Sequence, residues 1–182
     1  MKPRSMHRIL PAFAIAGALA LAGCGGDDGD DEGNGVDRAF VADMVPHHQS
    51  AVAMAEIAME RGESPFVKKL AGDIVASQSK EITTMRREDA GLAEAGVKTA
   101  SLGVPAHMMG MDDDPATLRS AEPFDRRFIE MMLPHHEAAV TMAKVELAKG
   151  KDPELEQLGE EIIAAQQREI AAMRAELPKL GG

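Results

Sequence analysis

Two stretches of this 182-residue chain read FVADMVPHHQSAVAMA (residues 40–55) and FIEMMLPHHEAAVTMA (residues 128–143), 88 residues apart. The similarity continues without a gap, and residues 40–86 and 128–174 share 19 identities in 47 positions. An internal repeat of this strength indicates a duplication whose two copies share one structure. We therefore expect one domain over residues 37–177, in which a linker at 91–121 joins the halves 37–90 and 122–177.

Each half is predicted to be a pair of helices. Apolar residues recur at helical spacing, and no alternating strand pattern is present. Gly62 followed by Pro65 marks the turn of the first half, and Gly150 followed by Pro153 marks that of the second. The helices are predicted at 38–61, 65–90, 122–149 and 153–177. The expected fold class is all-α, a ferritin-like four-helix bundle of two duplicated helical hairpins, with a linker long enough to cross over the bundle.

Two prolines fall within these helical patterns. Pro46 and Pro134 each directly precede a pair of histidines. A proline inside a helix removes a hydrogen bond and bends the helix, which would re-aim the histidines. The alternative is that each proline starts the helix proper, after a separate turn.

The N-terminal segment has the features of an export signal. Residues 1–23 combine three basic residues with an apolar run that is too short to span a bilayer comfortably. The run ends in LAGC at residues 21–24, which resembles the cleavage box of bacterial lipoproteins, where the Cys24 thiol would receive diacylglycerol. An ordinary signal with a chance cysteine is the alternative. Residues 24–36 are an acidic Gly/Asp tether, so we expect a lipid-anchored protein of the cell envelope whose domain lies on the extracytoplasmic side of the membrane.

The composition limits the classes of function. The formal charge of −10 does not favour a nucleic-acid partner, because phosphate binding needs a basic surface. The single cysteine excludes an internal disulfide framework and a cysteine-based zinc cage. Methionine is unusually frequent, with 13 residues.

Polar residues interrupt the apolar faces of the predicted helices. His47 and His48 lie on the face of the first helix, and Gln78 and Glu81 lie on that of the second. A turn centred near residue 63 would bring His48 near Gln78, and Met44 and His47 near Glu81. Buried polar groups need a partner, so either each cluster binds a metal or it is a satisfied contact among gap-filling methionines. The cluster recurs in the second half as Met132, His135, His136, Gln166 and Glu169. This repetition favours metal binding, with a preference for one site in each hairpin over one shared site.

A second signal lies in the linker, where His107, Met108, Met109 and Met111 surround Gly110. Thioethers favour Cu(I), and imidazole suits both Cu(I) and Cu(II). The linker is therefore predicted to carry a separate, softer copper site, and the alternative is a flexible loop with incidental methionines.

The doubled pattern Met-x-Pro-His-His-x-x-Ala-x-x-Met-Ala, each copy followed by Gln-x-x-Glu-Ile-x-x-Met, resembles the ferritin-like bacterial family catalogued as domain of unknown function 305. The resemblance covers residues 37–177, and it departs from the usual family pattern at Pro46 and Pro134. It implies a helical bundle of the cell envelope, copper binding and copper resistance. The positions that match as ligands are Met44, His47, His48, Met54, Gln78, Glu81 and Met85, with Met132, His135, His136, Met142, Gln166, Glu169 and Met173.

Three functions remain open. The first is a non-enzymatic copper-binding protein that buffers copper or passes it to partner proteins, with self-association undecided. The second is a di-metal oxidase, although such bundles use Glu-x-x-His motifs that are absent here, and only Glu81 and Glu169 are available as inner carboxylates. The third is a structural bundle without metal. Protons compete with metal for imidazole, so binding at the histidine pairs is expected to weaken between about pH 7 and pH 5.

Overall fold

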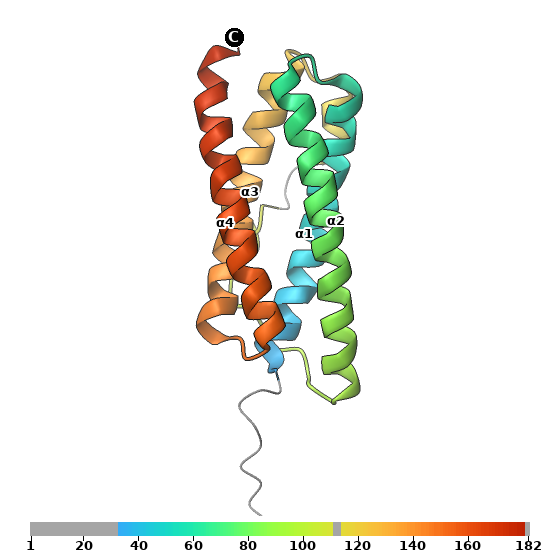
Figure 1. Cartoon of the computed structure of the whole chain (residues 1–182), viewed down its shortest axis with the longest axis vertical. Coiled ribbons are helices and arrows are strands. Elements are labelled where there is room, and N and C mark those ends of the chain that lie inside the picture. The colour runs from blue at the N-terminus through green and yellow to red at the C-terminus, as the bar shows by residue number, and fades with distance from the viewer. Residues whose placement is uncertain (1–32, 111–113, 181–182) are drawn as a thin grey trace, which may run out of the picture.

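The computed structural model describes residues 33–110 and 114–180, and these residues form four long helices (Figure 1). The helices are α1 (Gly35–Arg61), α2 (Pro65–Glu94), α3 (Phe124–Lys149) and α4 (Pro153–Glu176). Three short 3-10 segments complete the described structure, η1 (Ala106–Met108), η2 (Pro115–Ser120) and η3 (Leu177–Lys179). The prediction of an all-α four-helix bundle is confirmed. The expected signal peptide, Cys24 and Met111 lie outside the described residues.

Helix boundaries differ from the predicted ones by a few residues. Helix α1 begins inside the expected tether, because Asn34 caps it: the Asn34 side chain accepts a hydrogen bond from the Val36 N–H, and the Asp37 carboxylate accepts one from the Asn34 N–H. Helix α2 continues into the expected linker as far as Glu94, and the linker contains two 3-10 segments. Pro46 and Pro134 lie inside continuous helices, so neither starts the helix proper.

The two hairpins meet head to tail. Asp125, in the first turn of α3, accepts hydrogen bonds from the backbone of the α1–α2 turn. Asp37, in the first turn of α1, accepts hydrogen bonds from the backbone of the α3–α4 turn. Helices α1 and α3 are therefore antiparallel, and the linker, which the sequence showed to be long enough to cross over, runs from one end of the bundle to the other (Figure 1).

The apolar core is divided into two clusters. Along α1, residues up to Met44 belong to one cluster and residues from Ala51 onward belong to the other. On α3 the division falls between Met132 and Ala139, except that Val140 packs with the cluster of Met132. Both histidine pairs therefore lie between the two apolar clusters. The six helical methionines that were predicted as ligands are fully buried within these clusters, as Met44, Met85 and Met142 in one and Met54, Met132 and Met173 in the other.

None of the helices within the described ranges combines the length and apolar character that crossing a membrane requires.

Candidate metal site

A layer of polar side chains crosses the bundle between the two apolar clusters. We call it the polar layer, and its members are His47, His48, Gln78, Glu81, His135, His136, Gln166 and Glu169. The histidines and glutamines are at most 2% exposed, whereas the two glutamates are half-buried. The sequence predicted that this set lies on the inward helix faces, and the structure places two histidines, one glutamine and one glutamate on equivalent helices of each hairpin.

Within each hairpin, one histidine is bonded to one glutamate. The His48 Nε2 atom lies 2.8 Å from Glu81 Oε2, and the His136 Nε2 atom lies 2.7 Å from Glu169 Oε2. The sequence placed His48 near Gln78, and His47 near Glu81, from a register three residues away from the observed one, in which His48 is the histidine hydrogen-bonded to Glu81. A shift of three residues is about one helical turn and keeps the same faces buried, so periodicity did not distinguish the two registers.

The remaining two histidines meet between the hairpins. The ring centroids of His47 and His135 are 3.7 Å apart, and the rings are tilted by 32°. Neither nitrogen of either ring has a hydrogen-bond partner. The preference for two separate sites did not foresee this contact, because spacing within a hairpin carries no information about side chains of the other hairpin.

The polar layer concentrates unpaired hydrogen-bonding groups. In the described part of the chain, and leaving aside Glu146, whose carboxyl group pairs with that of Asp37, every buried side-chain nitrogen or oxygen without a partner belongs to this layer. Leaving such a group unpaired costs on the order of 1–3 kcal/mol. A layer retained only for stability would be expected to satisfy these atoms, so the arrangement favours a ligand.

Burial also keeps the central histidines neutral. Burial, followed by the charges of neighbouring histidines, lowers the pKa of His135 to about 3, and the same causes lower the pKa of His47 still further. Both imidazoles therefore present a free lone pair at neutral pH, which is the form that binds a metal.

The Met-rich linker lies against the histidine pair. Gly110 has φ +64°, and a Cβ placed on it would lie 3.2 Å from His135 Cα and 3.6 Å from His47 Nε2. Met109 is half-buried against the cluster that contains Met44, whereas His107 and Met108 are exposed. The linker was expected to hold a separate site, and the structure places its inner edge beside the centre of the bundle.

The donor set limits the ions that fit. Within residues 33–110 and 114–180, no three His, Cys, Asp or Glu side chains converge closely enough to hold a metal. An ion at His47 and His135 would therefore need further donors to move toward it, and the polar layer and the adjoining apolar clusters offer imidazole, amide and thioether groups. Neutral imidazole with thioether suits copper, whereas zinc takes imidazole, thiolate or carboxylate and not thioether, and di-iron sites use carboxylates.

Comparison with known proteins agrees with this chemistry. The family described as "Domain of unknown function (DUF305)" matches residues 37–177. The chain belongs to the DUF305 family. Its structure is similar to that of CopM in the Cu(II)-bound form, with a TM-score of 0.69 and 34% identity over 79% of this chain and 96% of CopM. Related CopM structures contain Cu(I) or Ag.

Two further proteins are similar to this chain. A DUF305 protein from Streptomyces coelicolor has a TM-score of 0.68 and 26% identity over 82% of this chain and 94% of that one. The protein L153 of Acanthamoeba polyphaga mimivirus is 42% identical over 51 residues, which are 28% of this chain and 34% of the viral protein. The chain therefore matches about a third of the length of the viral protein.

One buried acidic pair in this DUF305 chain was missed by the sequence analysis. Burial, followed by the hydrogen bond and the charge of Asp37, raises the pKa of Glu146 to about 9, so Glu146 is protonated at neutral pH. Burial would raise the pKa of Asp37, but hydrogen bonds from Glu146 and from backbone N–H groups lower it. Ala58 occupies the equivalent position of the first half. A glutamate in one half at a position where the other half has alanine was the sequence signal that could have revealed this pair.

Proposed function

We propose that this protein is a non-enzymatic envelope lipoprotein that binds copper in the polar layer and acts in copper buffering, resistance or delivery. The observation that carries the proposal is the contact between His47 and His135, two neutral imidazoles without hydrogen-bond partners in a buried layer. The similarity to CopM, which has been solved with Cu(I) and with Cu(II), supports copper as the ion.

The surroundings of the pair suit both oxidation states. Imidazole nitrogens bind Cu(I) and Cu(II), and buried thioethers on both sides of the layer add donors that favour the reduced ion. Three roles are distinguished: His47 and His135 as primary ligands, His48 and His136 as ligands oriented by their glutamates, and Met109 with the buried methionines as soft donors. The orientation of His48 and His136 by a carboxylate is typical of metal-binding histidines.

The envelope location is proposed from the N-terminal sequence. Cys24 would carry the lipid and residues 25–32 would separate the bundle from the membrane, so that the copper site faces the extracytoplasmic space. The intact mass of protein extracted from membranes should include a diacylglyceryl group on Cys24. A soluble product that retains residues 1–23 would contradict this part of the proposal.

The direct test is the metal content of untagged protein purified from cells grown with copper, followed by equilibrium dialysis with Cu(I) and Cu(II). The proposal predicts bound copper that survives dialysis. Bound iron would instead support a di-metal oxidase. Absence of any bound metal, in cells and after dialysis, would support a structural bundle.

A further inference from the structure

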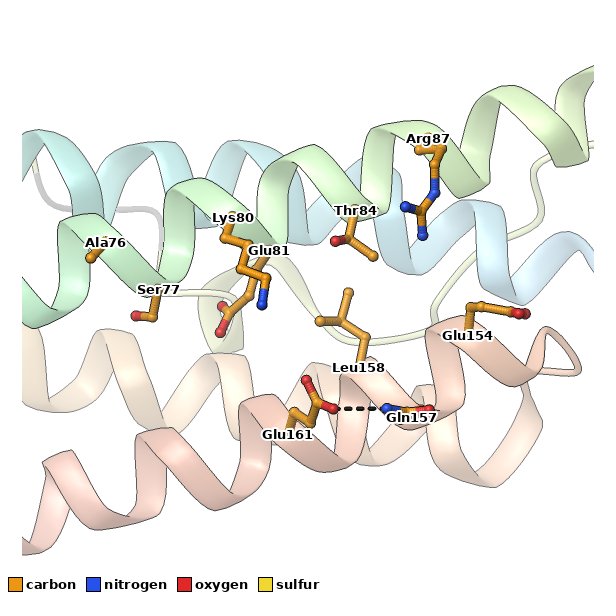
Figure 2. A pocket seen from close by; sticks show the side chains of 10 residues that line it. All are labelled: Ala76, Ser77, Lys80, Glu81, Thr84, Arg87, Glu154, Gln157, Leu158 and Glu161. Atoms are coloured by element: carbon orange, nitrogen blue, oxygen red, sulfur yellow. Dashed lines mark hydrogen bonds between the residues drawn. The ribbon is translucent and has the colours of Figure 1, made fainter.

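Two surface pockets lie between helices α2 and α4, on the same face of the bundle. The first pocket has a volume of about 630 Å³ and includes Lys80, Glu81 and Leu158, as Figure 2 shows. The second has a volume of about 380 Å³ and includes Arg168 and Glu169. Residues of the first pocket recur in the second at positions displaced by 88, so the duplication has produced two equivalent pockets.

Each pocket reaches one carboxylate of the polar layer. The side chains of Glu81 and Glu169 are 15% and 19% exposed, whereas their partners His48 and His136 are completely buried. In Figure 2 the Glu81 side chain extends into the space between the two helices. The carboxylates are therefore the members of the polar layer that contact solvent on this face.

The grooves within the hairpins differ in this respect. The pocket between α1 and α2 includes Ala53 and Ile82, and the pocket between α3 and α4 includes Thr141 and Ile170. These two pockets are also related by the duplication, but neither includes a member of the polar layer. The two pockets between α2 and α4 thus reach the polar layer from solvent, whereas the two pockets within the hairpins do not.

We propose that Glu81 and Glu169 are the ports through which copper ions enter the polar layer. Each carboxylate takes a hydrated ion from its pocket and passes it to the buried histidine to which it is bonded. A carboxylate suits this role because the negative charge of a partly exposed side chain attracts a cation, and one of its oxygens already lies within 3 Å of the histidine nitrogen. This inference rests on the proposed copper binding and adds the route by which copper arrives.

The first test compares the rate of Cu(II) loading with the amount bound at equilibrium. The double variant Glu81→Gln with Glu169→Gln should load at least about tenfold more slowly than the wild type. The matched control is Glu161→Gln with Asp73→Asn, which removes an acidic group from each pocket without touching a histidine. The control should load at the rate of the wild type.

The second test closes the pockets and leaves the carboxylates intact. Thr84→Trp with Ala172→Trp fills equivalent positions of the two α2–α4 pockets, and Ala53→Trp with Thr141→Trp fills equivalent positions of the grooves within the hairpins. The first pair should slow loading with little change in the copper bound at equilibrium. The second pair should change neither, and circular dichroism should confirm that both fold.

The outcomes separate the route from the function. The ports would be overturned if copper loads at the wild-type rate both in the double glutamate variant and in the variant with tryptophan at Thr84 and Ala172. If the glutamate variant binds copper more weakly only because it releases copper faster, the ports are also overturned. The glutamates would then be ligands and not ports. A wild-type protein that binds no copper at equilibrium would overturn the proposed function itself, together with this route.

Discussion

Asp37 and Asp125 are equivalent residues of the two halves, and each accepts hydrogen bonds from the turn of the other hairpin. The Asp37 Oδ1 atom lies 2.9 Å from the Lys151 nitrogen and 3.0 Å from the Asp152 nitrogen. The Asp125 oxygens lie 2.8 Å from the Glu63 nitrogen and 2.7 Å from the Ser64 nitrogen. This reciprocal capping fixes the two hairpins against each other and thereby brings together histidines that are 88 residues apart.

The capping predicts a measurable loss of stability. Asp125→Ala should lower the free energy of unfolding by about 2–3 kcal/mol, because it leaves two backbone N–H groups without a charged acceptor. Asp114→Ala, which removes a single cap from an exposed 3-10 segment, should cost about 1 kcal/mol or less. Chemical denaturation of both variants provides the measurement, and equal losses would contradict the role assigned to Asp125.

The close approach of the linker depends on Gly110. A Cβ there would meet Ala138 Cβ at 3.0 Å and His135 Cα at 3.2 Å, so Gly110→Ala should displace the linker from the histidine pair and weaken Cu(I) binding. Gly103 has a similar positive φ of +75° but nothing within 4 Å of a Cβ. Gly103→Ala therefore reproduces the backbone strain without the clash. If both variants bind Cu(I) equally well, the linker does not contribute to the central site.

The thioethers of the linker should distinguish the two oxidation states. Replacing Met108, Met109 and Met111 by Leu is expected to weaken Cu(I) binding far more than Cu(II) binding, because thioether is a soft ligand. Met59 is 51% exposed and lies outside the linker, so Met59→Leu controls for the loss of an exposed methionine. Competition titrations with Cu(I) and Cu(II) chelators measure both affinities, and an equal loss for the two ions would argue against thioether ligation.

The lowered pKa values of His47 and His135 change the expected response to acid. In the unfolded chain these histidines bind protons below about pH 6.5, whereas in the folded metal-free protein His135 does so only near pH 3 and His47 lower still. The unfolded state therefore binds more protons, and stability should fall as the pH drops below 6.5, by about 1.4 kcal/mol per pH unit for each histidine. Denaturation at pH 7 and pH 5 should show this slope.

The same shifts predict that copper at the central pair is retained at pH 5, where ordinary histidines would release it. The expectation of weaker binding between about pH 7 and pH 5, which assumed unperturbed imidazoles, therefore does not apply to this pair. His47→Leu with His135→Leu should reduce the acid dependence of stability. An acid dependence identical to that of the wild type would show that these two histidines are not its source.

The sequence predicted the helices, their faces and the buried polar residues, because helical periodicity and turn residues are local signals. It did not predict that His48 pairs with Glu81, since a register shift of one turn leaves the same faces buried. It also did not predict the contact between His47 and His135. That contact depends on the head-to-tail meeting of the hairpins, which is set by Asp37 and Asp125 over long separations in the chain.

The central claim is that the two hairpins share one copper site at His47 and His135. The most direct measurement is a copper titration at pH 7 of the wild type, of His47→Ala, of His135→Ala and of the double variant. The account predicts that either single change removes the same tightly bound ion and that the double change removes no more, because both residues hold one ion. Loss of half the capacity in each single variant and of all capacity in the double variant would show two independent sites and contradict the shared centre.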